Sequence, residues 1–153
     1  MNVHFVLLPE AVGTSSADSK RAVLDLLAER FSAVYGLDRD HVLERIEERE
    51  RLGSTGFGRG VAIPHARIEG LQRPVAAMLR LDTPVAFDAA DGLPVDIVFG
   101  LLSPEAAGAI HLHALAAISR LMRDDAMDRA LRQAPGPEAM FGLLSNVIDR
   151  DAA

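Results

Sequence analysis

Residues 94–102 read Pro-Val-Asp-Ile-Val-Phe-Gly-Leu-Leu, and this nearly unbroken apolar run is the strongest indicator of the fold. Asp96 is its only charged residue. A strand with one solvated face alternates apolar and polar side chains, whereas a strand covered on both faces stays apolar along its length. We therefore expect this run to form a sheet strand that neighbouring elements cover on both sides.

Two helices are expected upstream of this strand. The first has apolar residues at helical spacing between residues 23 and 34, and Gly36 marks its end. The second covers about residues 38–51, where Asp38 and Asp40 favour a helix start and Gly53 favours a stop. The candidate N-caps of the first helix are Ser15, Ser16 and Asp18.

The remaining elements complete a mixed α/β pattern. Alternation over residues 75–81 predicts a strand with one drier face, ended by Asp82-Thr-Pro, and residues 61–63 predict a short strand. Ser103-Pro-Glu is expected to begin a helix, and two more helices are expected over residues 124–133 and 138–148. This order favours one domain over residues 1–153, an α/β sandwich in which a mixed β-sheet is flanked by α-helices. The residues expected on the buried side of the helix after Ser103 are Ile110, Ala114, Leu115 and Ile118.

Composition excludes several classes of protein. The chain has 153 residues, a formal net charge of −6, 5% aromatic residues and no cysteine, which excludes a disulfide scaffold and argues against nucleic acid as a partner. The longest apolar candidate for a membrane helix, residues 106–118, includes His111 and His113 and falls short of the roughly 18 residues required, so no membrane insertion is expected. Without cysteine or a positively charged leader, the expected location is cytoplasmic.

Residues 49–67 read Arg-Glu-Arg-Leu-Gly-Ser-Thr-Gly-Phe-Gly-Arg-Gly-Val-Ala-Ile-Pro-His-Ala-Arg and form the most informative stretch for function. The spacing from Gly53 to Gly58 imitates a P-loop, but Arg59 and Gly60 stand where the phosphate lysine and the magnesium ligand would be. The glycines are also too evenly spaced for a dinucleotide fingerprint. Nucleotide binding therefore has little support.

The same stretch has the chemistry of an anion site. Backbone N–H groups, hydroxyls and guanidinium groups stabilise the oxygens of a phosphoryl group, and this segment is basic within an acidic chain. It contains four arginines, Arg49, Arg51, Arg59 and Arg67, and only one acidic residue, Glu50. The candidate phosphate-binding loop consists of Gly53, Ser54, Thr55, Gly56, Gly58 and Gly60.

His65 is the candidate nucleophile of this site. Pro64 restricts the backbone on both sides of itself, so the imidazole is presented from a stiff, extended approach. A neutral imidazole has a lone pair at neutral pH and can accept a phosphoryl group without a metal or cofactor. In the alternative interpretation, His65 only pairs with a loop carbonyl.

His111 and Arg49 are the candidate helpers. His111 and His113 point about 200° apart on a helix, so they cannot form a metal-binding pair. His111 lies on the flank of the buried face, where it could be a core histidine or could reach the loop. Arg49 could hold a phosphoryl group with its guanidinium or could be a solvated helix residue.

Residues 53–66 closely resemble the active-site signature of the enzyme IIA domains of the fructose and mannitol class in the bacterial phosphotransferase system. The similarity extends through residues 83–88, 94–99 and 110–115, and within this class it is strongest to the stand-alone nitrogen-regulatory enzyme IIA. The resemblance implies an α/β sandwich in which His65 accepts a phosphoryl group from an HPr-like phosphocarrier protein. It also implies that His111 is a second active-site imidazole and that Arg49 is the family's arginine.

Several functions remain open at this point. A phosphohistidine carrier would regulate unidentified target proteins through its change of charge. A sugar-specific enzyme IIA would use the same chemistry and pass the phosphoryl group to a transporter IIB domain. A metal-dependent hydrolase lacks a local multi-ligand motif in the sequence, and an interaction module could bind an anion at the glycine loop without chemistry.

Overall fold

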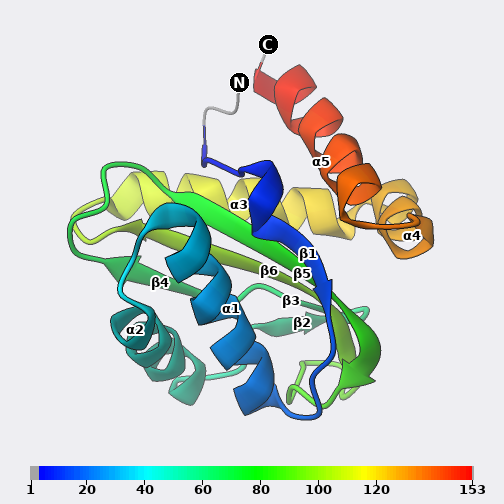
Figure 1. The fold of residues 1–153 in the computed structure, drawn as a ribbon, viewed down its shortest axis with the longest axis horizontal. Coiled ribbons are helices and arrows are strands. Elements are labelled where there is room, and N and C mark those ends of the chain that lie inside the picture. The colour runs from blue at the N-terminus through cyan, green and yellow to red at the C-terminus, as the bar shows by residue number, and fades with distance from the viewer. Residues whose placement is uncertain (1–3, 153) are drawn as a thin grey trace.

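The computed structural model describes residues 4–152, and a six-stranded mixed sheet organises them (Figure 1). The α/β sandwich expected from the sequence is confirmed. The elements in chain order are η1 (Pro9–Ala11), β1 (Val12–Ser15), α1 (Lys20–Tyr35), α2 (Arg39–Arg51), β2 (Gly56–Gly58), β3 (Val61–Ala62), β4 (His65–Ile68), β5 (Val75–Val85), β6 (Val95–Pro104), α3 (Gly108–Arg123), α4 (Asp125–Gln133) and α5 (Pro137–Ala152).

Strand β6 is the centre of the sheet. It pairs antiparallel with β5 on one side, and β1 lies parallel to β5 at the far edge. Its other side is shared by β3 and β4, which both run parallel to β6. The chain from residue 61 to 68 therefore follows β6 in two short pieces, separated by Ile63 and Pro64.

Helices cover both faces of this sheet. Helices α1 and α2 pack on one face and α3, α4 and α5 lie on the other (Figure 1). Alternate residues of β5 enter the two cores, with Ala77 and Leu79 facing α1 and α2 and Ala76 and Met78 facing the opposite layer. Burial on both faces explains why the run over residues 94–102 carries so few polar side chains, as expected.

The N-cap of α1 differs from the expectation. Ser19 caps the helix by accepting from the Ala22 N–H at 3.1 Å, whereas Ser15 ends strand β1 and Ser16 bonds Asp82. Strand β1 was not expected, because its four residues are too few to show a period. Gly36 ends α1 in the left-handed conformation, and Asp38 caps α2, both as expected.

Three boundaries near the centre of the sheet were predicted wrongly. Strand β5 continues past Asp82 to Val85 after an irregularity in its pairing, and both of its faces are buried over most of its length. Ser103 lies within β6 and does not begin a helix, since α3 starts at Gly108. Ile110 was expected on the buried side of this helix but is 55% exposed in the first turn of α3, while Ala114 and Ile118 are buried as expected.

The glycine-rich segment contains more strand than expected. Besides β3, where a strand was predicted over residues 61–63, it forms β2 and β4, so His65 is the first residue of a strand and does not lie in a loop. Arg59 and Gly60 join β2 to β3 with φ of 62° and 79°, a conformation that glycine adopts easily and arginine rarely. Such short strands cannot be recognised from periodicity.

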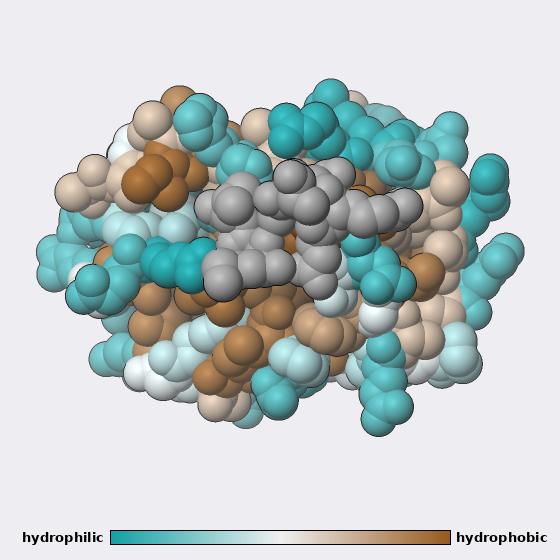
Figure 2. All heavy atoms as spheres, turned by 90° about the horizontal axis from the view of Figure 1, so that it is seen from above, coloured by the Kyte–Doolittle hydropathy of each residue, from teal (hydrophilic) through white to brown (hydrophobic). Residues whose placement is uncertain are grey.

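The surface mixes polar and apolar side chains. On the face in Figure 2, hydrophobic residues lie in several patches between hydrophilic ones, which is ordinary for folded domains. None of the helices within residues 4–152 is long and apolar enough to cross a bilayer.

Candidate functional site

His65 is held at the break between β3 and β4. The carbonyl of the neighbouring Pro64 accepts from the Leu101 N–H at 3.0 Å, which anchors the chain to β6 at this break. The His65 Nδ1 atom lies 2.8 Å from the Ile63 carbonyl oxygen. A carbonyl can only accept, so Nδ1 carries the proton in this pair. The lone pair of the neutral ring is therefore on Nε2.

His111 brings a second imidazole from α3. The ring centroids of His65 and His111 are 5.6 Å apart, although 46 positions separate the two residues in the sequence. The His111 side chain is buried, and its Nδ1 lies 2.7 Å from the hydroxyl oxygen of Ser103 in β6. His113 is exposed on the other side of α3, as the helical geometry predicted.

The two imidazoles share a hollow of about 340 Å³ between α2, β4 and α3, which we call the imidazole hollow. Arg49 comes from the last turn of α2 and Arg67 from β4, two residues after His65. Neither guanidinium has a carboxylate partner within 4.0 Å among residues 4–148, whose side chains the structure describes. The residues that line the hollow are Arg45, Glu48, Arg49, Leu52, His65, Ala66, Arg67 and His111.

Both imidazoles favour the neutral form. Burial is the largest cause that lowers the pKa of His65; Arg49 lowers it further, while the Ile63 carbonyl and Glu50 act in the opposite direction. Burial also lowers the pKa of His111, to about 4, with added contributions from His65 and Arg67. At neutral pH both rings are therefore uncharged, which keeps a nucleophilic lone pair on His65.

Glu50 and Arg49 secure the chain that enters the site. The buried Glu50 carboxylate accepts from the Thr55 N–H and hydroxyl and pairs with Lys20 at 2.8 Å, which ties α2 to α1 and to the loop. The Arg49 Nη1 atom donates to the Gly53 carbonyl at 2.8 Å. That bond closes the C-terminal end of α2 and holds the guanidinium at the rim of the imidazole hollow.

The predicted phosphate-binding loop has other local partners. The Ser54 hydroxyl donates to the Phe87 carbonyl at 2.6 Å, and the Thr55 hydroxyl bonds Glu50. A Cβ on Gly56 would lie 2.9 Å from Ala89, and Gly58 lies beside Asp91. Both hydroxyls thus support the local backbone. Among the residues that line the hollow, only Arg49, His65 and His111 belong to the predicted site, and none comes from the glycine loop.

The predicted cluster of four arginines is divided. Arg49 and Arg67 reach the imidazole hollow, while Arg51 lines a separate depression with Lys20 and Glu50. Arg59 lies in the β2–β3 turn, and its guanidinium pairs with Asp125 and donates to the Arg123 carbonyl at 2.9 Å. The basic segment is therefore not one anion site, because two of its four arginines lie away from the imidazole hollow.

Ser103 and Leu52 were not among the predicted site residues, and neither were Arg45, Glu48 and Ala66, which also line the hollow. Ser103 is fully buried, and its position as the polar end of an apolar strand was a usable signal. The expectation of a helix start assigned it to a cap instead. Leu52 is 84% exposed beside the hollow, and no pattern of spacing distinguishes it.

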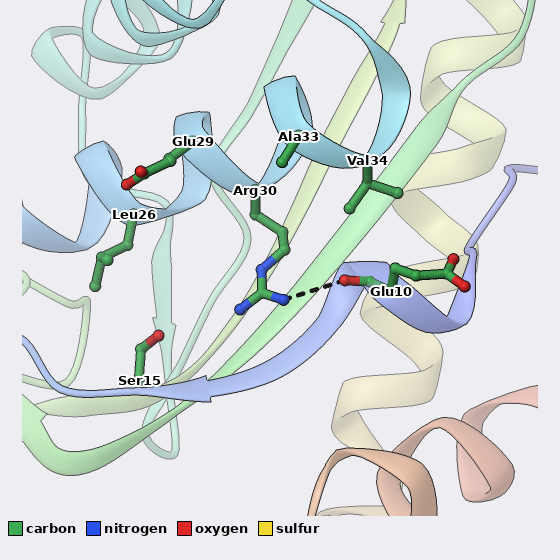
Figure 3. A pocket seen from close by; sticks show the side chains of 7 residues that line it. All are labelled: Glu10, Ser15, Leu26, Glu29, Arg30, Ala33 and Val34. Carbon is green, nitrogen blue, oxygen red and sulfur yellow. Dashed lines mark hydrogen bonds between the residues drawn. The ribbon is translucent and has the colours of Figure 1, made fainter.

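A larger hollow of about 590 Å³ lies between α1 and the segment from η1 to β1 (Figure 3). Its lining includes Glu10, Glu29 and Arg30, and the Arg30 Nη1 donates to the Glu10 carbonyl at 3.1 Å. Its lining contains no histidine. This hollow has the larger volume of the two, but the imidazole hollow has the chemistry expected of a functional site. Within the described part of the chain, no three His, Asp or Glu side chains gather closely enough to hold a metal ion.

Comparison with known proteins gives a uniform result. The family model described as "Phosphoenolpyruvate-dependent sugar phosphotransferase system, EIIA 2" matches residues 6–147. A nitrogen regulatory protein of Pseudomonas aeruginosa is 47% identical over 131 residues, 84% of each chain, and one of Bradyrhizobium diazoefficiens is 40% identical over 146 residues, 95% of each chain. The crystal structure of nitrogen regulatory protein IIA-Ntr from Neisseria meningitidis superposes with a TM-score of 0.84 at 32% identity, covering 91% of this chain and 96% of that one. The resemblance stated from residues 53–66 is thereby confirmed.

Proposed function

Because this chain belongs to the EIIA 2 family of the phosphoenolpyruvate-dependent phosphotransferase system, we propose that it carries a phosphoryl group on Nε2 of His65. The observation that supports this most strongly is the bond from His65 Nδ1 to the Ile63 carbonyl. That bond leaves the Nε2 lone pair as the nucleophile of the ring. The surrounding guanidinium groups make the hollow suitable for an anion.

The proposed transfer is a direct exchange between two imidazoles. The Nε2 lone pair of His65 attacks the phosphorus of a phosphohistidine on an HPr-like carrier, and the donor's P–N bond breaks as the new P–N bond forms. The electron pair of the broken bond returns to the donor nitrogen. The positive charge left on the His65 ring is stabilised at Nδ1 by the Ile63 carbonyl, which accepts the N–H bond.

Arg49 and Arg67 are proposed to stabilise the transferring group. Their guanidinium groups line the hollow without a carboxylate partner among residues 4–148, so they can pair with phosphoryl oxygens. His111 donates a further hydrogen bond, or orients His65, from a ring whose centroid lies 5.6 Å away. This set of donors supplies the charge stabilisation that the step needs, so the proposed reaction requires no metal ion or cofactor.

The nitrogen-regulatory branch is the function supported by the similar relatives, which carry the name nitrogen regulatory protein. We propose that the chain acts in the cytoplasm as a regulator. Phosphorylation places nearly two negative charges on the phosphoryl oxygens and one positive charge on the His65 ring, and the exposed oxygens would repel a target that docks there through a carboxylate and attract one that presents arginine. A sugar-specific enzyme IIA would instead pass the phosphoryl group to a transporter IIB domain.

A reconstituted relay tests this proposal. The full chain is incubated with labelled phosphoenolpyruvate, the first enzyme of the relay and an HPr-like carrier, and the label is then tested for stability in acid and base. We expect a label that is labile in acid and stable in base, as a phosphohistidine is. A chain that never becomes labelled would support the anion-binding module instead, and rapid onward transfer to a IIB domain would support the sugar-specific alternative.

A further inference from the structure

Ser103 lies at a position that the transfer step does not by itself explain. The residue pairs with Arg67 in the register of β6 and β4, and its side chain is fully buried. Its hydroxyl oxygen lies 2.7 Å from Nδ1 of His111. Among the side chains of residues 4–148 and the backbone of residues 4–152, this imidazole nitrogen is the only hydrogen-bond partner of the hydroxyl.

The direction of this hydrogen bond follows from the cost of an unpaired donor. If Nδ1 carried the proton and Ser103 accepted it, the serine O–H would be buried with no acceptor, and an unsatisfied buried polar group is costly. If the serine O–H donates to the Nδ1 lone pair, its proton is satisfied. The neutral His111 ring then carries its own proton on Nε2.

We propose that Ser103 is a positioning residue that donates its hydroxyl proton to Nδ1 of His111 and so holds that ring in the tautomer with an N–H at Nε2. Its effect on phosphoryl transfer rests on the proposed function above. The two ring nitrogens lie on opposite edges of the imidazole, so Nε2 is directed away from Ser103. His111 lines the imidazole hollow, and its Nε2–H is the remaining polar group of the ring.

This assignment gives the two imidazoles opposite tautomers for opposite tasks. His65 has its proton on Nδ1, held by the Ile63 carbonyl, and presents a lone pair. His111 has its lone pair on Nδ1, held by Ser103, and presents an N–H. Phosphoryl oxygens only accept hydrogen bonds, so a lone pair on Nε2 of His111 would repel the group that the Nε2–H stabilises.

Nitrogen-15 spectroscopy of the imidazole rings tests the assignment without any phosphorylation. Long-range proton–nitrogen correlations at neutral pH in the full chain should show the Nε2–H tautomer for His111 and the Nδ1–H tautomer for His65. In Ser103→Ala, the His111 Nδ1 resonance should move to the position of a lone pair that accepts no hydrogen bond. Ser119→Ala, on the same helix as His111, is the matched control and should leave it unchanged.

A double-mutant cycle on the rate of phosphoryl transfer is the second test of the role of Ser103. Removing one hydrogen bond of ordinary net strength should slow transfer to His65 by about two- to tenfold in Ser103→Ala. The same substitution in a His111→Ala background should have no further effect, since the serine acts through that ring. Ser103→Thr keeps the hydroxyl and should keep the wild-type Nδ1 resonance, which covers the case in which the alanine variant folds poorly.

The outcomes are separable. An Nδ1–H tautomer for His111 in the wild type, or an equal loss of rate with and without His111, would overturn the role of Ser103. A wild-type chain that takes up no label would contradict the proposed function, while the tautomers would still decide the assignment of Ser103.

Discussion

The basic segment at residues 49–67 supplies arginines to two regions with opposite surroundings. At the imidazole hollow, Arg49 and Arg67 lie beside two neutral imidazoles, and no carboxylate of the described residues pairs with them. At the β2–β3 turn, Arg59 pairs with Asp125, and the adjacent Arg132 pairs with Asp96 and Asp128. An arginine with acidic partners fastens two elements, whereas one without them is available to an incoming anion.

The paired region explains a residue that interrupts the central strand. Asp96 lies in β6, and its carboxylate bonds Arg132 of α4, whose guanidinium also donates to the Arg59 carbonyl at 2.9 Å. These contacts connect the sheet, the β2–β3 turn and α4. Asp96 therefore has a structural role in the sheet, and this cluster lies outside the imidazole hollow.

The largest expected effect is the loss of the nucleophile. His65→Ala should abolish acid-labile labelling, because Nε2 of this ring is the proposed acceptor and the residue contributes little to the apolar cores. Uptake of label from the carrier is measured after circular dichroism has verified folding. His113→Ala removes an exposed imidazole from α3 and is the control that should label normally. Near wild-type labelling of His65→Ala would refute the assignment.

Arg49→Ala and Arg59→Ala compare the two arginine regions. Losing an unpaired guanidinium beside the transferring group should slow transfer by about 100-fold. Arg59→Ala removes a guanidinium from the paired region, so transfer should be unchanged and stability should fall by at most about 1 kcal/mol, as for other exposed ion pairs. Quenched transfer from a labelled carrier and chemical denaturation of both variants give these values. Equal transfer defects in the two variants would remove the distinction between the regions.

His111→Ala should show a smaller defect than Arg49→Ala. One hydrogen-bond donor is lost and the nucleophile remains, so transfer should slow by about 30-fold at this partly solvated site. The rate is compared in both directions, with residual labelling on His65 as the diagnostic result. Wild-type rates in both directions would make His111 a core histidine without a part in transfer.

The pH dependence of stability probes the same hollow without any donor. A pKa of about 4 for the buried His111 means that the unfolded chain binds a proton below pH 6.5 that the native chain does not. This contribution to stability is complete above pH 6.5 and is lost as pH falls toward 4, by about 1.5 kcal/mol between pH 6.5 and pH 5. Urea denaturation of the wild type and of His111→Ala at both pH values measures how the free energy of unfolding changes with pH. An identical pH dependence in the two proteins would contradict this prediction.

The fold was largely predictable because its core strand is a nearly unbroken apolar run and its helices have clear periods. The apolar residues around 95–102 indicated a strand buried on both faces. Gly36 and Asp38 could be recognised as helix ends because a cap depends on the residue at that position. Strands β1, β2 and β4 have two to four ladder partners each and owe their extended form to β5, β6 or β3, so local sequence does not reveal them. For the same reason, the local sequence did not reveal that His65 is the first residue of a strand.

The candidate site was predictable in its chemistry and less so in its membership. The Pro64–His65 pair and the basic segment indicated an imidazole in an anion site, and His111 lay on the expected flank of its helix. The division of the arginines depends on acids as distant in the sequence as Asp125, which only the folded chain brings together. The pairing of Ser103 with His111 likewise depends on where β6 ends and α3 begins.

The location of the phosphoryl group on the ring tests the central claim most directly. The full chain, labelled with nitrogen-15 and phosphorylated by an HPr-like carrier, is examined by phosphorus and long-range proton–nitrogen spectroscopy. The bond from Nδ1 of His65 to Ile63 predicts a phosphoryl group on Nε2 of His65 with the proton retained on Nδ1. A phosphoryl group on Nδ1, on His111 or on a hydroxyl would contradict the account.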